Sequence, residues 1–254
     1  MPASAPTVVA AQRSPLSDRV RTDQEPVASS STTPVYVDEY VTLYCGDARD
    51  ILPALINDGQ RWDACITDPV WPAAPTTIPG HHEADALLTA IASMLVGAAA
   101  RLVVQVGSRT DPRWLRDTVD CTWPYICCQH LEYAMPSYRG RQLLNDIAYV
   151  FGTWPAVRDV PSAVAPGRLT CTHPIDVRWH PAPRAYDHVV GLVKWWAGSG
   201  PIIDPFAGSG TTLLAAKTLG VRCVGIEREP AYCDGIIRRL AQARFSFTTE
   251  TGHE

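Results

Sequence analysis

The sequence predicts an α/β protein built on a doubly wound, mostly parallel sheet. From about Val35 onward, short apolar runs alternate with stretches of helical character, which is the pattern of parallel strands joined by crossover helices. The chain has 254 residues, of which 46% are hydrophobic and 19% charged, so it can bury a sizeable core. This composition excludes collagen, coiled coils and wholly disordered chains.

The elements expected along the chain begin after an N-terminal tail. Residues 1–34, rich in Ala, Ser, Thr and Pro, are expected to be disordered and to precede one domain over residues 35–254. Apolar runs predict strands at Val41–Tyr44, Asp63–Thr67, Leu102–Val106, Ile147–Phe151, Pro201–Asp204 and Val221–Glu227. Helical stretches are predicted at Ala84–Ala99, Pro183–Ala197, Thr211–Leu219 and Pro230–Phe245. The Pro- and Arg-rich stretch from Gly152 to Trp179 is expected to form a small irregular insertion.

Apolar run lengths and cysteine spacing indicate the compartment. No apolar run reaches the ~18 residues that a membrane helix needs, and the N-terminus lacks the pattern of a secretory signal. The eight cysteines include no C-x-x-C pair, so we expect reduced thiols in a cytoplasmic protein. Cys65 and Cys223 lie in apolar runs and are expected to act as small hydrophobes. Because the spacing of Cys121, Cys127, Cys128, Cys171 and His173 is irregular, no metal site is predicted.

The net charge of −4 is unevenly distributed. A negative total is weak evidence against a general nucleic-acid binder. However, residues 1–100 carry a net charge of −7, whereas residues 101–184 carry +3 and all ten of their cations are Arg. Arg binds phosphate and stacks on bases better than Lys does. Coding bias in a GC-rich genome is an alternative reason for the choice of Arg, but it does not explain the position of the excess.

The run Ile202–Thr212 reads as a strand, a glycine turn and the start of a helix. Glycines allow a tight turn and close approach of a ligand to the backbone, and Thr211 or Thr212 is expected to cap the helix. Glu227 follows Asp204 by 23 residues and ends the next predicted strand. A carboxylate about 20 residues beyond such a turn commonly binds ribose hydroxyls. The run differs from both G-x-G-x-x-G and the P-loop, and it predicts a nucleoside site.

A second candidate site follows the strand Asp63–Thr67, which ends at Asp68-Pro69-Val70-Trp71. Functional side chains of parallel sheets gather at the carboxyl ends of strands, so Asp68 and Glu227 are expected to share one rim. Only 27 residues follow Glu227, so the remaining strands of the sheet must come from the N-terminal half of the chain. The strand before Asp68 therefore precedes the strand before Asp204.

These residues resemble a known family. The run from Asp204 to Thr212 (DPFAGSGTT) resembles the S-adenosylmethionine-binding motif of DNA amino-methyltransferases, and the order of the motifs resembles the β-type, circularly permuted class. The resemblance implies a Rossmann-like methyltransferase fold with S-adenosylmethionine as cofactor. It assigns cofactor contacts to Asp204, Phe206, Gly208, Ser209, Gly210 and Thr211 at the methionine end, Glu227 at the ribose, Asp47 at the adenine, and His180 and Arg184 from a segment resembling H-P-x-x-K-P.

Asp68-Pro-Val-Trp71 resembles the family motif D/N/S-P-P-Y/F/W, with Val70 in place of the second proline. The resemblance implies that Asp68 and the Pro69 carbonyl accept the two N–H bonds of a base amine while Trp71 stacks on the flipped base. The expected activity is methyl transfer to an amine of DNA, with adenine N6 preferred. The alternatives are cytosine N4, RNA or a small molecule as acceptor, or a subunit that binds cofactor and DNA but in which Val70 marks lost catalysis.

Target recognition is expected within residues 108–180. The candidate contacts to DNA are Arg109, Arg113, Arg116, Arg139, Arg141, Arg158, Arg168 and Arg178. Trp114, Trp123, Trp154, Trp195 and Trp196 are instead assigned to the core. The resemblance implies double-stranded DNA as partner and a restriction–modification setting in a prokaryotic or phage-infected cell, and it leaves a homodimer open.

Overall fold

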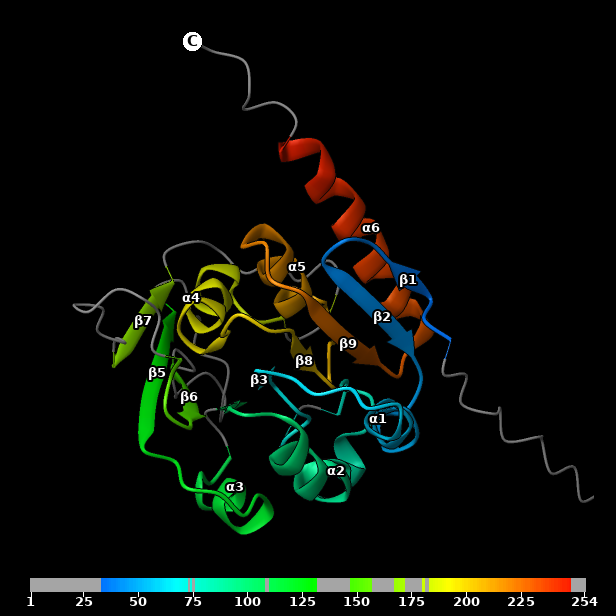
Figure 1. Cartoon of the computed structure of the whole chain (residues 1–254). Coiled ribbons are helices and arrows are strands. Elements are labelled where there is room, and N and C mark those ends of the chain that lie inside the picture. The colour runs from blue at the N-terminus through cyan, green and yellow to red at the C-terminus, as the bar shows by residue number, and fades with distance from the viewer. Residues whose placement is uncertain are drawn as a thin grey trace, which may run out of the picture.

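One sheet lies at the centre of the molecule and contains all of the strands among the described residues. The computed structural model describes residues 33–72, 74, 76–107, 110–131, 147–156, 167–171, 180 and 183–247. These residues form a nine-stranded sheet in the order β1-β2-β9-β8-β3-β4-β6-β5-β7 (Figure 1). The strands are β1 (Tyr36–Val37), β2 (Val41–Cys45), β3 (Ala64–Thr67), β4 (Leu102–Val106), β5 (Tyr125–Leu131), β6 (Ile147–Gly152), β7 (Arg168–Cys171), β8 (Ile202–Asp204) and β9 (Cys223–Glu227).

The central part of the sheet is parallel. Strands β2, β9, β8, β3 and β4 run parallel to one another. At the two sides of this group, β1 pairs antiparallel with β2, and β6 pairs antiparallel with both β4 and β5. The last strand, β7, pairs parallel with β5. The residues of β3, β4 and β8 are all buried, which is the pattern expected for strands covered on both faces. The predicted fold class, a doubly wound and mostly parallel α/β sheet, is confirmed.

Helices cover both faces of the sheet. One face packs against α4 (Tyr186–Trp196), α5 (Thr211–Thr218) and α6 (Pro230–Phe247). The other face packs against α1 (Ala48–Asn57), α2 (Ala84–Ala98) and α3 (Arg113–Thr118), and a short 3-10 helix, η1 (His81–Glu83), leads into α2. Each helix contributes an apolar side to one of two cores separated by the sheet.

Strands β3 and β8 lie side by side, although they are far apart in the chain. Ala64 pairs with Ile202, and Cys65 pairs with Ile203. From β8 the chain crosses through α5 to β9 on one side, and from β3 it crosses through α2 to β4 on the other. The strand order therefore changes direction between β3 and β8, and open α/β sheets bind ligands beyond the carboxyl ends of the strands at such a point.

The predicted elements match the structure to within a few residues. All six predicted strands and all four predicted helices are present. The main differences are that α4 and β9 begin a few residues later than predicted. Sequence analysis did not predict β1, α1, α3, β5 or β7. The described parts of residues 108–180 form α3, β5, β6 and β7, and these strands continue the main sheet. Of the predicted tail, residues 1–32 lie outside the described residues.

The packing predictions are confirmed except at Trp154. Trp114 and Trp123 are partly buried against one core, and Trp195 is partly buried against the other. Cys65 and Cys223 are buried in the core, and Trp196 is fully buried. Trp154, predicted to be a core residue, is 73% exposed. The space above Gly152 is occupied by the indole of Trp196, whose Nε1 donates to the Thr153 carbonyl at 2.9 Å. The chain therefore leaves the sheet before Trp154 can reach the core.

No helix among the described residues is both long enough and apolar enough to cross a membrane.

A buried ion pair joins the first strands to the last helices. Lys217 Nζ donates to Asp38 Oδ2 at 2.8 Å and to the Leu240 carbonyl at 3.1 Å. Burial raises the pKa of Asp38, but hydrogen bonds from Lys217, Tyr36 and two backbone N–H groups outweigh burial, so that the net shift is downward. The ionised pair thus stabilises the folded state above the ordinary pKa of an aspartate, and this contribution is lost in acid.

Lys217→Met is expected to lower the free energy of unfolding at pH 7 by about 3 kcal/mol, because it leaves the Asp38 carboxylate buried without its partner. The difference from the unchanged protein should shrink at pH 4, where Asp38 of the variant takes up a proton. Urea unfolding at the two pH values measures this. Lys194→Met is the matched control, because Lys194 is exposed on α4. Equal effects of the two substitutions would contradict the assignment.

Candidate functional site

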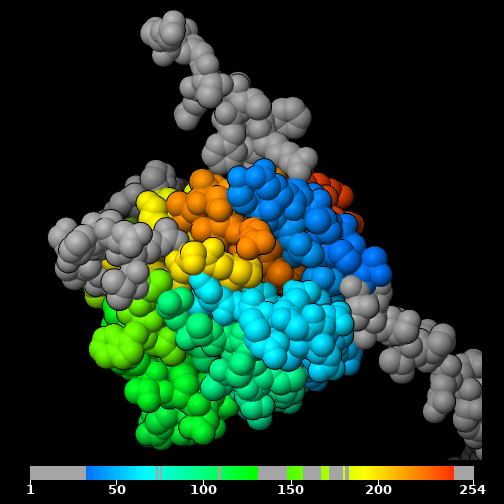
Figure 2. All heavy atoms as spheres, in the orientation of Figure 1, coloured from blue at the N-terminus to red at the C-terminus, as the bar shows by residue number. Residues whose placement is uncertain are grey.

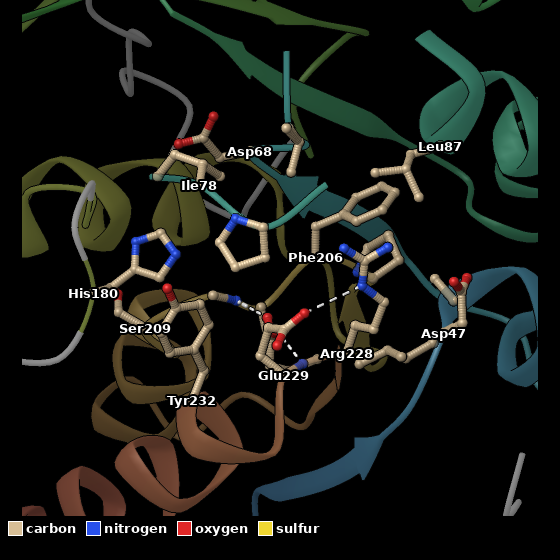
Figure 3. Close-up of a pocket in the computed structure, with 18 of the residues that line it drawn as sticks. Asp47, Asp68, Ile78, Leu87, His180, Phe206, Ser209, Arg228, Glu229 and Tyr232 are labelled. Carbon is tan, nitrogen blue, oxygen red and sulfur yellow. Dashed lines mark hydrogen bonds and ion pairs between the residues drawn. The ribbon is translucent and has the colours of Figure 1, made fainter. Parts of the chain in front are cut away.

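A pocket lies at the carboxyl ends of β3, β8 and β9 and is bordered by the N-terminal turn of α1, the segment before η1 and the start of α6. Figure 3 shows Asp68 and His180 toward one end of the pocket and Asp47 and Leu87 toward the other, with Phe206 and Arg228 between. The lining includes Asp47, Asp68, Val70, Trp71, Ile78, Pro79, Leu87, His180, Arg184, Phe206, Gly208, Ser209, Thr211, Glu227, Arg228, Glu229 and Tyr232. The two motifs that the sequence placed on one rim therefore meet in one pocket.

The turn after β8 brings backbone groups to the floor of the pocket. Gly208 has a φ of +54° and Gly210 a φ of +75°, a conformation that L side chains rarely adopt. A Cβ on Gly210 would also lie 2.8 Å from Ile236 Cγ1 of α6, so that glycine is required for packing as well. Gly210 occupies the N-cap position of α5 without a side-chain cap. The predicted threonine cap is wrong, because the Thr212 hydroxyl instead turns to Asp204.

Asp204 fixes this turn from inside the protein. Its side chain is fully buried, and its Oδ1 accepts hydrogen bonds from Thr67 Oγ1 at 2.7 Å and from the Phe206 N–H at 3.2 Å. Its Oδ2 accepts from Thr212 Oγ1 at 2.6 Å and from Arg184 Nη2 at 2.7 Å. Asp204 does not line the pocket, so in this geometry it holds together β3, the turn and Arg184.

Glu227 ends β9 and reaches into the middle of the pocket. Its Oε2 accepts from the Gly208 N–H at 2.7 Å, and its Oε1 accepts from the Glu229 N–H at 2.8 Å. Burial raises the pKa of Glu227 to about 7, although the two backbone N–H groups act in the opposite direction. Each carboxylate oxygen still has a lone pair, so the group can accept hydrogen bonds from a pair of ligand hydroxyls.

A chain of ion pairs borders the far end of the pocket. Arg49 binds the Asp47 carboxylate through Nε at 2.9 Å and Nη2 at 2.6 Å, and its Nη1 reaches Glu83 at 3.1 Å. Glu83 also accepts from Arg228 Nη1 at 2.6 Å. Burial raises the pKa of Asp47, but the Arg49 hydrogen bonds outweigh it and the net shift is downward. This network ties α1, η1 and the end of β9 around an apolar wall that includes Phe206, Ile78 and Leu87.

Asp68 stands at the opposite end, directly after β3. Its side chain is 9% exposed, and its Oδ2 lies 4.0 Å from Arg184 Nε. Burial raises the pKa of Asp68 to about 7, with the Arg184 charge lowering it and the Asp204 charge raising it. Asp68 Oδ1 is buried and has no hydrogen-bond partner. The site thus holds a carboxylate that is poised to change its protonation near neutral pH and has one acceptor atom unused.

The segment after Asp68 places an aromatic ring beside it. Trp71 packs against Gly107 at the end of β4 so closely that a Cβ on Gly107 would lie 2.3 Å from Trp71 Nε1. The Thr110 hydroxyl donates to the Pro72 carbonyl at 2.6 Å and fixes the chain beyond the ring. Val70 and Trp71 line the pocket, whereas Pro69 is buried and does not.

His180 and Tyr232, which both line the pocket, form a pair of rings. Their centroids are 4.7 Å apart in an edge-to-face arrangement. A Cβ on Gly208 would lie 3.6 Å from His180 Nε2, so the imidazole also approaches the glycine turn. His180, predicted to contact a cofactor, does line the pocket.

Most of the predicted pocket residues are brought together, but others were missed. Ten of the predicted residues line the pocket, namely Asp47, Asp68, Trp71, His180, Arg184, Phe206, Gly208, Ser209, Thr211 and Glu227. The other three, Pro69, Asp204 and Gly210, are not part of its lining. Sequence analysis missed Arg228, Glu229 and Tyr232. Their position directly after the predicted ribose carboxylate is the one signal that could have found them.

The predicted DNA contacts are only partly within the described residues. Arg109, Arg139, Arg141, Arg158 and Arg178 lie outside them. Arg168 on β7 is exposed. Arg113 and Arg116 are exposed on α3, and each pairs with a neighbouring carboxylate, Asp111 and Asp117 respectively.

Comparison with known proteins gives one match in sequence and several in structure. Residues 172–239 match a family model described as DNA methylase (N6_N4_Mtase). The chain resembles the structure of the M1.HpyAVI–SAM complex with 22% identity and a TM-score of 0.59, over 79% of this chain and 99% of that one.

Two further structures are similar. PvuII DNA methyltransferase, described as cytosine-N4-specific, gives 15% identity and a TM-score of 0.61, over 87% of this chain and 90% of that one. TTHA0409 from Thermus thermophilus, complexed with S-adenosyl-L-methionine, gives 22% identity and a TM-score of 0.52, over 80% of this chain and 95% of that one. These similarities confirm the fold predicted from the sequence.

Proposed function

We propose that this chain is a DNA amino-methyltransferase that transfers a methyl group from S-adenosylmethionine to adenine N6 of a base flipped out of duplex DNA. The match of residues 172–239 to the DNA methylase family model supports this proposal. The single observation that carries the proposal is the meeting of Asp68 and Glu227 in one pocket at the switch point of the sheet. Asp68 can accept hydrogen bonds from a target amine, and Glu227 can accept them from the ribose hydroxyls of a nucleoside cofactor.

The pocket residues fit S-adenosylmethionine along its length. Glu227 would accept hydrogen bonds from the two ribose hydroxyls. The apolar wall around Phe206 would enclose the adenine beside Asp47. The absence of a Cβ on Gly208 would let the backbone of the turn approach the methionine end closely. When bound, the cofactor supplies an electrophilic methyl group on a sulfonium centre.

Asp68 then determines the reactivity of the amine. The lone pair of an exocyclic amine is conjugated with the base ring, so the amine is a poor nucleophile. Asp68 Oδ1 and the Pro69 carbonyl would accept its two N–H bonds and localise the lone pair on nitrogen. Asp68 would stabilise the positive charge that the amine nitrogen gains on methylation, and it would take the proton that this nitrogen then releases.

Trp71 would stack on the flipped base and fix its plane. A flipped base loses the stacking of the duplex, and base–aromatic stacking replaces part of it. The tight contact between Trp71 and Gly107 holds the indole at the pocket, so the ring position depends on the absence of a side chain on residue 107.

Gly107→Ala is expected to displace Trp71 and to lower kcat/KM for methyl transfer by roughly 10-fold, because stacking contributes about 1–3 kcal/mol per base. Cofactor affinity, measured by calorimetry, should stay within about 3-fold. Gly97→Ala is the matched control, because nothing lies within 4 Å of a Cβ at this exposed position of α2. Unchanged kcat/KM in Gly107→Ala would argue against a stacking role for Trp71.

Cytosine N4 is the second candidate acceptor. Its amine also carries two N–H bonds beside a ring nitrogen, and one of the similar structures is described as cytosine-N4-specific. Adenine is preferred because an aspartate at the first position of the catalytic motif, as at Asp68, leans toward adenine in the family.

Duplex DNA would approach the end of the pocket where Asp68 and Trp71 lie. We assign recognition to the region 108–180, in which arginines predominate among the cations. Phosphate contacts release counterions, so affinity for DNA should fall as salt rises.

Base-resolved sequencing of DNA from cells that express the chain tests the proposal. We expect methylated adenine at one short sequence, and no methylation in cells that express Asp68→Ala. In vitro, radiolabelled cofactor should label duplex DNA in preference to RNA. Equal labelling by the unchanged protein and Asp68→Ala, or the absence of any modified base, would contradict the proposal.

A further inference from the structure

Two neighbouring side chains of the pocket lining each carry a buried polar atom without a hydrogen-bond partner. Among the described residues whose side chains line the pocket, Asp68 Oδ1 and Arg184 Nη1 are the buried side-chain nitrogen or oxygen atoms that lack a hydrogen-bond partner. The Asp68 side chain is 9% exposed and the Arg184 side chain 5% exposed. An unsatisfied buried polar group costs about 1–3 kcal/mol, so two of them at one site indicate that a ligand supplies the missing partners.

Arg184 is held in place by other contacts. Its Nη2 donates to Asp204 Oδ2 at 2.7 Å and also to the Thr212 hydroxyl. Its Nε lies 4.0 Å from Asp68 Oδ2. Because the guanidinium is planar, these contacts fix its orientation and leave Nη1 as a donor with a set direction.

Asp68 Oδ1 is an acceptor and Arg184 Nη1 is a donor, and they belong to side chains that approach each other to 4.0 Å at Oδ2 and Nε. On the Watson–Crick edge of adenine, the N6 amine donates and the neighbouring N1 accepts, and cytosine presents the same order at N4 and N3. Guanine and thymine present the reverse order, with a carbonyl acceptor beside an N–H donor. Enzymes that act on flipped bases read this edge by hydrogen bonding.

We propose that Arg184 determines specificity for the flipped base by donating a hydrogen bond from Nη1 to the ring nitrogen beside the target amine, while Asp68 accepts one N–H of that amine. This inference rests on the proposed function. The bond from Arg184 orients the base and excludes guanine and thymine. It does not activate the amine, because a donor at the ring nitrogen draws electron density away from it.

The test compares duplexes that carry adenine, 1-deazaadenine or 7-deazaadenine at the methylated position, with the unchanged protein. Loss of N1 should lower kcat/KM by roughly 10- to 100-fold, the size of a hydrogen bond to a charged group, and loss of N7 by less than about 3-fold. Replacing N1 by carbon makes the amine more electron-rich and weakens its base pair. Intrinsic reactivity and flipping alone would therefore raise the rate.

Arg184→Lys identifies the donor. The ammonium keeps a positive charge for Asp204 and Asp68 but has no planar fork, so it cannot hold both its anchor and the base. The ratio of kcat/KM between adenine and 1-deazaadenine should fall to less than about 3 in this variant. Arg184→Gln should give the same ratio, and thermal unfolding of both variants checks that they fold. If the sequencing identifies cytosine as the target, 3-deazacytosine replaces 1-deazaadenine.

The outcomes separate the inference from the proposed function. No methylation of the unmodified duplex would contradict the proposed function itself. Normal methylation with equal rates on adenine and 1-deazaadenine would overturn the inference alone. So would a 1-deaza effect that remains undiminished in Arg184→Lys, because the donor would then be another group.

Discussion

Asp68→Ala is expected to lower kcat for methyl transfer by roughly 10³-fold, comparable to the loss of a preorganised group that faces charge in a transition state. The substitution removes the acceptor that localises the amine lone pair and the charge that stabilises the methylated nitrogen. Affinity for S-adenosylmethionine, measured by calorimetry, should change little, because Glu227 and the apolar wall lie further along the pocket. The exposed Asp58→Ala is the matched control. A loss confined to cofactor affinity would contradict the catalytic assignment.

The same carboxyl makes the folded protein less stable as pH rises from about 4 to about 7. Burial raises the pKa of Asp68 from 3.8 to about 7, so the folded state binds more protons than the unfolded state between these values. The contribution of Asp68 to the free energy of unfolding therefore falls as pH rises through this window. Asp68→Asn removes the cost of burying the charge, and its Tm should exceed that of the unchanged protein at pH 8 by more than at pH 5. A Tm difference that does not vary with pH would contradict this account.

Glu227→Gln is expected to weaken S-adenosylmethionine binding by roughly 30-fold and to leave kcat at saturating cofactor nearly unchanged. The carboxylate accepts the N–H groups of Gly208 and Glu229. An amide keeps one acceptor oxygen but turns an NH₂ group toward the other N–H, so the variant loses a charge-assisted hydrogen bond and part of the turn geometry. Calorimetric titration measures the affinity, and the exposed Glu39→Gln is the control.

The pH dependence of binding provides a second arm of this prediction. Burial raises the pKa of Glu227 to about 7, and ribose hydroxyls are bound best by the ionised form. The affinity of the unchanged protein for S-adenosylmethionine should therefore fall as pH drops below about 7, whereas that of Glu227→Gln should not. A fall of equal size in both proteins would assign the titration to another group.

The fold could be predicted largely because its central strands are continuous apolar runs. Strands covered on both faces, such as β4, carry the signal in the sequence itself. The pairing of β3 with β8 was not predicted, because the sequence indicated only that Asp68 and Glu227 share one rim of the sheet. α1 was missed because Pro53 lies inside it, and proline usually ends a helix. Burial of Ile51, Leu52 and Leu55 on one side of α1 outweighs that local preference.

The parts of the site that lie in sequence motifs were predicted. The parts that depend on packing between distant segments of the chain were not. Asp68 and Glu227 lie at strand ends, so their meeting followed from topology. Asp47 was assigned to the site by the resemblance to the family. The position of Arg184 did not follow, because its role depends on contacts with Asp204, Thr212 and Asp68 from three separate segments. Asp204 faces inward for the same reason. Glu83 and Arg228 pair across 145 positions of sequence, which no local pattern encodes.

The strand order also has a consequence for biosynthesis. In the sheet, β2 and β3 are separated by β8 and β9, which come much later in the chain (Figure 1). Figure 2 shows the same arrangement at the surface, where the orange and yellow atoms of later residues lie between the blue and the cyan atoms of earlier ones. A nascent chain that has not yet released residues 202–227 from the ribosome therefore has open edges on β2 and β3 where those strands will pair. Unpaired apolar edges invite association with other chains. The protein can close its sheet, and form its pocket, only after residues 202–227 have been translated.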